Sequence, residues 1–93
     1  MTIKKLTKMP YANAHIEIDD NGNIYLYSYV TLVAELTADG WLTVFELYSM
    51  TTRRHISAFM NEYTETLNYY DAKQAYEGGY SINVETGEIE EVC

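Results

Sequence analysis

Apolar and polar residues alternate along the first half of the chain with the two-residue period of β-strands. The clearest segment, residues 24–36, is rich in aromatic and β-branched residues and contains no Pro or Gly, so it predicts one long strand. Its alternation places Tyr25, Tyr27 and Tyr29 on one face of that strand. Ser28 falls on the other, apolar face, where a bend or bulge would interrupt a strand of this length.

Two further alternating segments flank this strand, over residues 13–18 and 41–48. The intervening residues 19–23 and 37–40 are dense in Asp, Asn and Gly, which predicts a tight turn at each place. Consecutive strands joined by short turns form an antiparallel meander.

The hydrophobic period changes to that of an amphipathic helix after residue 50. The predicted apolar stripe consists of Ile56, Phe59, Met60 and Tyr63, and the candidate N-caps are Ser49, Thr51 and Thr52. Arg53 and Arg54 fall in the first turn, where the helix dipole disfavours cations, so we expect a carboxylate such as Glu46 beside them.

A second helix is predicted over residues 68–77. Asn68 and Asp71 have the spacing of a capping box, and Gly78-Gly79 is a typical helix stop. A last strand is expected from Tyr80 to Val84, followed by a turn at Thr86-Gly87.

Together these elements predict a single α+β domain over residues 1–93. Its fold would be an antiparallel β-meander of three to four strands with one or two helices packed on one face. Residues 88–93 are expected to form a frayed acidic tail.

The charge of the chain is strongly acidic. Six Lys and Arg stand against fourteen Asp and Glu, a formal net charge of −8, which argues against nucleic acid or an anionic membrane as a direct partner. The candidate acidic interaction surface lies on the two predicted helices and comprises Glu62, Glu65, Asp71 and Glu77. The alternative is that these charges only keep a small protein soluble.

Tyrosine is over-represented, with ten residues among 93. Tyr side chains suit interfaces because they combine an apolar ring with a polar tip. Tyr25, Tyr27 and Tyr29 are therefore a candidate aromatic contact surface, and a homodimer is its simplest use. The alternative is that the rings shield the sheet while their hydroxyls meet water.

No motif for catalysis, metal binding or a cofactor rises above background. His15, His55 and Cys93 are isolated, and residues 19–23 resemble a calcium loop only superficially because the closing Glu is missing. We therefore expect no enzyme, no metal and no cofactor. A single cysteine, and the lack of a long apolar run, predict a cytoplasmic protein.

The chain contains the pattern Y-S-Y-x-T-x-V-A at residues 27–34 and the pattern Y-S-x-T-T-x-x-H-I-x-x-F at residues 48–59. In these two segments it resembles an uncharacterised family of small proteins from bacterial phages and mobile genetic elements. The matching positions include Thr51, Thr52, Arg54 and His55, which form a predicted polar corner between a strand pair and a helix start. This corner is either a hydrogen-bonded junction or a small recognition site.

The resemblance implies a non-enzymatic protein in the cytoplasm of a bacterial host that acts by binding another protein. Small acidic proteins of mobile elements include anti-CRISPR and DNA-mimic inhibitors, so the sharper hypothesis is inhibition of a host nucleic-acid-binding defence protein. The alternative is a self-associating structural module that uses its tyrosine face. A small ligand at the Arg54 and His55 corner is a third hypothesis.

Overall fold

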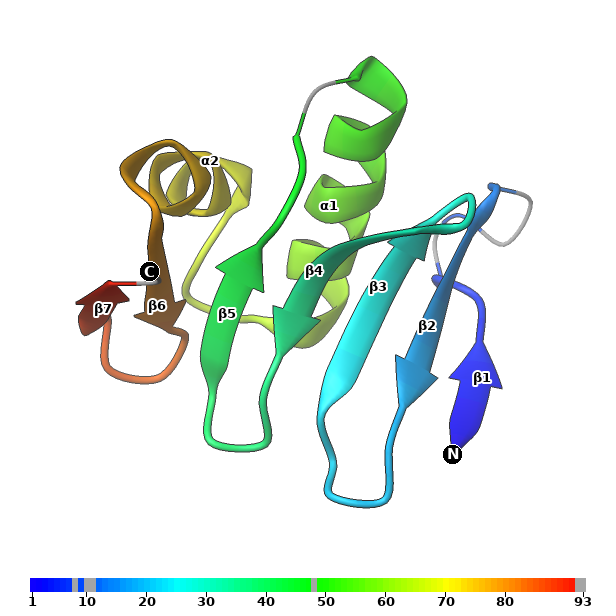
Figure 1. Ribbon diagram of the computed structural model, residues 1–93, viewed down its shortest axis with the longest axis horizontal. Coiled ribbons are helices and arrows are strands. Elements are labelled where there is room, and N and C mark those ends of the chain that lie inside the picture. The colour runs from blue at the N-terminus through cyan, green and yellow to red at the C-terminus, as the bar shows by residue number, and fades with distance from the viewer. Residues whose placement is uncertain (8, 10–11, 48, 92–93) are drawn as a thin grey trace.

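The computed structural model describes residues 1–7, 9, 12–47 and 49–91, and it contains one antiparallel sheet with two helices (Figure 1). Seven strands follow one another across the sheet in chain order. They are β1 (Thr2–Lys4), β2 (Ala14–Ile18), β3 (Ile24–Ser28), β4 (Thr31–Leu36), β5 (Trp41–Val44), β6 (Tyr80–Asn83) and β7 (Ile89–Glu91).

Both helices are inserted between β5 and β6. Helix α1 (Met50–Tyr63) packs against β3 and β4, whereas α2 (Tyr69–Gly78) packs against β5 and β6. In Figure 1, α1 passes behind the sheet, and the face turned to the viewer is left uncovered by the described residues. The predicted α+β class, with helices packed on the sheet, is confirmed. The predicted number of strands was too low, since the sheet has seven rather than three to four.

The segment predicted as one long strand forms two. Strand β3 ends at Ser28 and β4 begins at Thr31, and these two residues pair across a two-residue turn, Tyr29–Val30. Tyr29 adopts a left-handed backbone angle, φ = 57°, which two-residue hairpin turns require. Asn or Gly usually marks such a turn, so the aromatic sequence concealed it. Tyr29 therefore lies at the hairpin tip, 58% exposed, and not on a strand face with Tyr25 and Tyr27.

Other strand boundaries also differ from the prediction. Strand β5 ends at Val44 instead of continuing to residue 48, and Tyr48 itself lies outside the described residues. Residues 89–91, expected within a frayed tail, pair with β6 as strand β7. Residues 92 and 93 lie outside the described part of the chain.

The core lies between the helices and the sheet. Ile16, Leu26 and Leu42 point to it from three strands, and each is fully buried. From α1, the predicted stripe supplies Ile56, Phe59 and Met60, which are also fully buried, and Tyr63 packs at its margin. The helical period of these residues is therefore explained by their contact with the sheet.

The predicted start and stop of α2 are confirmed, and one of the three candidate N-caps of α1 is the residue used. Ser49 Oγ accepts the backbone N–H of Thr52 at 3.0 Å, so Ser49 is the N-cap of α1. Asn68 and Asp71 form a capping box at α2. Gly79 ends α2 with φ = 70°, a conformation that favours glycine because it has no Cβ.

Candidate functional site

One face of the sheet has no covering layer among the residues that the structure describes, because both helices pack on the other face. Strand alternation places on this face a set of half-buried side chains that we call the open face: His15, Glu17, Tyr25, Tyr27, Leu32, Glu35, Trp41 and Thr43. Their neighbours along each strand point to the core. The open face thus combines aromatic rings with carboxylates.

The strand register brings the carboxylates and rings of the open face into one row. Tyr25 lies directly opposite Glu17 on β2 and opposite Glu35 on β4. Residues opposite each other in antiparallel strands have Cβ atoms about 4.5–5.5 Å apart. Each carboxylate therefore borders a tyrosine ring.

A second row is held by side-chain contacts. The rings of His15 and Tyr27 are stacked, with centroids 4.9 Å apart and planes 2° from parallel. His15 Nε2 also donates to Glu17 Oε2 at 3.0 Å. These contacts fix the orientation of three open-face side chains before any partner binds.

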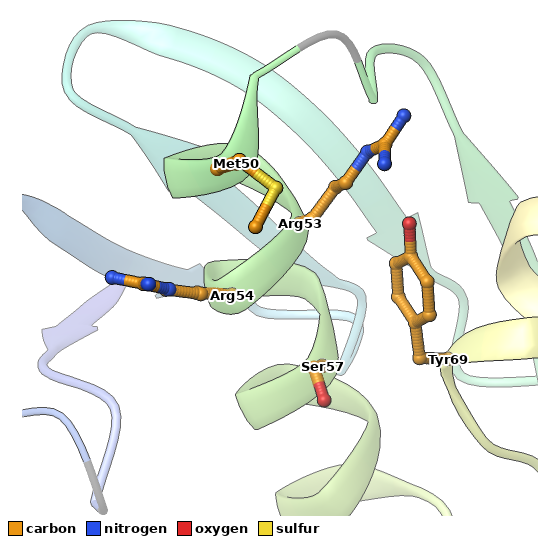
Figure 2. A pocket seen from close by; sticks show the side chains of 5 residues that line it. All are labelled: Met50, Arg53, Arg54, Ser57 and Tyr69. Atoms are coloured by element: carbon orange, nitrogen blue, oxygen red, sulfur yellow. The ribbon is translucent and has the colours of Figure 1, made fainter.

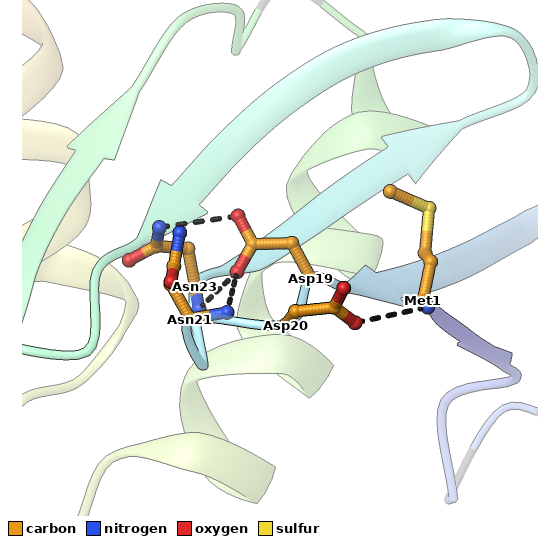
Figure 3. A network of polar contacts seen from close by, with 5 residues as sticks. All are labelled: Met1, Asp19, Asp20, Asn21 and Asn23. Carbon is orange, nitrogen blue, oxygen red and sulfur yellow. Dashed lines mark hydrogen bonds and ion pairs between the residues drawn. The ribbon is translucent and has the colours of Figure 1, made fainter.

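The turn at the end of the open face is organised by Asp19 (Figure 3). Its carboxylate accepts the backbone N–H groups of Asn21 and Asn23, at 2.9 and 3.0 Å. It also accepts the hydroxyl of Tyr25 at 3.1 Å, a contact outside the view of the figure. The hydrogen bond from the Asn23 backbone leads the causes that hold the pKa of Asp19 below its usual value. The residues that suggested a calcium loop are therefore engaged in shaping a hairpin turn.

The electrostatic character of this face follows from the sequence of its strands. Residues 9–52 contain no Lys or Arg and six Asp or Glu. The described Lys and Arg residues lie elsewhere. Lys4 is over the ring of Tyr63 at 5.8 Å, and Lys5 Nζ donates to the carbonyl of Ala12 at 3.4 Å. Arg53 and Arg54 are on α1, and Lys73 is on α2. The open face is therefore an anionic, aromatic surface.

Tyr25 and Tyr27 are the predicted aromatic residues that the structure brings together, and Tyr29 lies apart from them at the hairpin tip. Sequence reasoning missed Glu17 and Glu35 as their neighbours. Extending the alternation from β3 to the strands on each side would have found both.

The four predicted acidic residues on the helix side do not act alike. Glu62 accepts the backbone N–H of Thr7 at 2.7 Å, and Asp71 caps α2 by accepting the N–H of Asn68 at 2.9 Å. Glu65 and Glu77 are exposed. Two of the four carboxylates thus hold the fold together, which leaves a smaller free acidic surface on the helices than expected.

The predicted polar corner is divided between the core and the surface. Thr52 and His55 are buried, whereas Thr51 and Arg54 are exposed. Ser28 Oγ and His55 Nδ1 share a hydrogen bond of 2.8 Å that ties β3 to α1. The corner therefore contains a hydrogen-bonded junction, and its Arg54 and His55 side chains do not share one surface.

Stability should fall in mild acid because of His55. Burial lowers the pKa of His55 below its ordinary value of 6.5. The unfolded chain consequently binds the proton more readily, and the free energy of unfolding is expected to decrease as the pH falls below about 6.5, down to the folded-state pKa. Urea unfolding measured between about pH 8 and pH 5 tests this, and His55→Gln should remove this part of the slope. An unchanged slope in His55→Gln would contradict the assignment.

Comparison with known proteins identifies one relationship. Residues 1–77 match a family of unknown function, DUF8033. The chain belongs to the DUF8033 family. The DUF8033 match spans the open face, α1 and all but the last residue of α2, and it stops before β6 and β7. Neither the curated proteins nor the solved structures gave a match.

Among the described residues, no group of three or more His, Cys, Asp or Glu side chains is placed to hold a metal ion. Neither α1 nor α2 has the length and apolar character that a membrane-crossing helix needs.

Proposed function

We propose that this DUF8033 protein is a non-enzymatic binding module that holds a basic surface of another protein against its open face. The observation that carries the proposal is the pairing of tyrosine rings with carboxylates on a sheet face whose strands β2 to β5 contain no Lys or Arg. Carboxylates bind guanidinium and ammonium groups, and tyrosine rings attract the same cations through their π-faces. The open face therefore suits Arg and Lys side chains.

The open face is a better candidate than the helices for this contact. Its carboxylates, Glu17 and Glu35, both border Tyr25 in the register of the sheet. On the helix side, Glu62 and Asp71 are already engaged with backbone N–H groups. A partner bound there would meet mainly Glu65 and Glu77.

Self-association through the open face is the second candidate function, and it is favoured by the exposed portions of Tyr27, Leu32 and Trp41. A twofold dimer would, however, bring two copies of Glu17 and Glu35 close to each other, and like charges at an interface weaken binding. Light scattering of the purified protein distinguishes the two. A dimer that Tyr27→Ala dissociates without unfolding would support self-association and oppose the cationic-partner proposal.

We further propose where this protein comes from and which protein it binds. The chain would be a phage or mobile-element protein that resides in the cytoplasm and covers the nucleic-acid-binding surface of a host defence protein, as anti-CRISPR and DNA-mimic proteins do. This further proposal makes a separate prediction: the DUF8033 protein should compete with nucleic acid for the retained partner.

Reversing the charges of the open face should weaken partner binding strongly. We expect Glu17→Lys/Glu35→Lys to lower affinity for a basic partner by at least about tenfold, since each close ion pair it removes is worth about 1.5 kcal/mol or more. The measurement is quantitative retention of host proteins on the immobilised wild type and variant, repeated at low and high salt. Added salt should weaken the wild-type complex.

Glu65→Lys/Glu77→Lys is the matched control, because it changes the net charge by the same amount on the helix side. A partner retained by this control and lost by the open-face variant supports the proposal. Loss in the control alone would assign binding to the helices, and equal loss in both would indicate non-specific attraction. Thermal unfolding of all three proteins checks that each is folded.

A further inference from the structure

A shallow depression of about 270 Å³ lies between the first turns of α1 and the start of α2, on the helix side of the molecule (Figure 2). Its lining residues are Met50, Arg53, Arg54, Ser57 and Tyr69. The residues from α1 are three to four positions apart, so they follow one side of the helix. Tyr69, the first residue of α2, supplies the opposite wall.

Three hydrogen-bond donors at this depression lack a strong partner within the described part of the chain. The Arg53 guanidinium makes one long contact, from Nε to the carbonyl of Leu47 at 3.4 Å, and no described carboxylate lies within 4.0 Å of it. The Ser57 hydroxyl has no hydrogen bond there. Tyr69 Oη is enclosed by protein and also has none. An enclosed polar atom without a partner is costly, so Tyr69 Oη would gain from a hydrogen-bonding group that reaches it.

The orientation of the side chains separates the two arginines. Figure 2 shows the hydroxyl end of Tyr69 directed towards Arg53, while Arg54 extends away from both. Arg54 therefore contributes its stem to the wall, and Arg53 is the cation at the inner end. The expected partner Glu46 is not within ion-pair distance of either guanidinium.

Local charge favours an anion here despite the net charge of −8. The first turn of α1 has no acidic residue, and its free backbone N–H groups add a partial positive charge to that of the two arginines. Met50 is 64% exposed and gives the same depression an apolar rim. A bound molecule would meet a cation and an apolar surface together.

We propose that this depression binds a small oxyanion carried on an apolar body, either a carboxylate or a phosphate monoester on an aromatic or hydrocarbon group. Arg53 pairs with the anion and Ser57 donates to it. The apolar body lies against Met50 and the Tyr69 ring. A rotamer change of the exposed Arg53 side chain gives the anion access to Tyr69 Oη. The depression is slightly smaller than most drug-sized pockets, so the ligand is the size of a fragment.

Phenyl phosphate is the test probe because it joins an oxyanion to an apolar ring. Inorganic phosphate tests the oxyanion alone, and phenol tests the ring alone. We expect saturable NMR shifts of the ¹⁵N-labelled protein with a Kd near 1 mM for phenyl phosphate, several-fold weaker binding of inorganic phosphate, and no saturation with phenol up to about 10 mM. Benzoate tests the carboxylate source and should shift the same residues. The shifts should centre on Arg53, Ser57 and Tyr69.

Two variants assign the site. Arg53→Gln should weaken phenyl phosphate binding about tenfold, whereas Lys5→Gln, which removes one positive charge from another region, should not change it. Tyr69→Phe should weaken binding yet keep or raise the midpoint of thermal unfolding, because it removes an unpaired enclosed hydroxyl. Absence of saturation, equal loss in Lys5→Gln, or inorganic phosphate binding as tightly as phenyl phosphate would each overturn the proposal.

Discussion

Phe59→Ala is expected to lower the free energy of unfolding by about 3–5 kcal/mol, the range for truncating a fully buried aromatic residue. The Phe59 side chain is completely enclosed between α1 and the sheet, and the centroid of its ring lies 5.2 Å from the ring centroid of Tyr63. Alanine would remove the buried apolar area and leave a cavity that the surrounding strands only partly fill. A small domain has a stability of only about 5–15 kcal/mol, so the loss is large. Urea unfolding with a freely fitted m-value measures it.

Phe45 offers the matched control, since the sequence contains only two phenylalanines. Its side chain is 46% exposed just beyond the end of β5. Phe45→Ala removes the same atoms from a half-solvated site, and we expect a loss below about 1 kcal/mol. Similar losses in the two variants would mean that Phe59 is not at the centre of the core.

The helices were predictable because their signals are local. The stripe of Ile56, Phe59 and Met60 indicates a helix with one buried face, whichever part of the protein covers that face. The capping box of Asn68 and Asp71 forms its hydrogen bonds within a single turn. The strands depend on partners that are distant in sequence. The hairpin at Tyr29 was missed because tyrosine is typical of strands and rarely occupies a turn. The pairing of β3 with β4 nevertheless places Tyr29 in the turn with a left-handed backbone angle.

The short strands at the two edges show the same limit. Ile89, Glu90 and Glu91 look like a charged tail until β6 provides a strand to pair with. Thr2 to Lys4 form β1 only against β2. Three-residue strands of this kind carry too few residues to show an alternating pattern, so their pairing is visible only in the folded chain.

The sequence predicted two tyrosines of the candidate site, but it did not predict which carboxylates lie beside them. Alternation identified Tyr25 and Tyr27 as one face, but Glu17 and Glu35 become their neighbours through the register of three strands. The carboxylate of Glu62 appeared free in the sequence, because the backbone N–H of Thr7 that it accepts is brought to it only by the fold. Asp71 was counted as a free carboxylate as well, although its capping-box spacing with Asn68 indicated the hydrogen bond that it accepts. The charge of the chain alone therefore shows neither that Glu62 and Asp71 accept backbone hydrogen bonds nor that Glu17 and Glu35 lie beside a tyrosine of the sheet.

Ser28→Ala should cost about 1–3 kcal/mol of unfolding free energy, the penalty for leaving a buried polar group unpaired. Ser28 is 4% exposed and His55 is 2% exposed, and their 2.8 Å hydrogen bond joins β3 to α1 in the interior. The substitution would leave His55 Nδ1 without its partner on a side chain that is almost fully enclosed by protein. The measurement is urea unfolding near pH 8, where His55 is neutral in both states.

Two comparisons separate this penalty from a general effect of serine substitution. Ser57 lies on α1, as His55 does, but it is only half-buried and makes no hydrogen bond in the described part of the chain. Ser57→Ala should therefore change the free energy of unfolding by less than about 0.5 kcal/mol. In a His55→Phe background, Ser28→Ala should cost much less than in the wild type, because the buried nitrogen is already gone. An undiminished cost in that background would show that Ser28 stabilises the fold by packing. In that case the hydrogen bond between Ser28 and His55 would be present in the structure without stabilising the junction of β3 and α1.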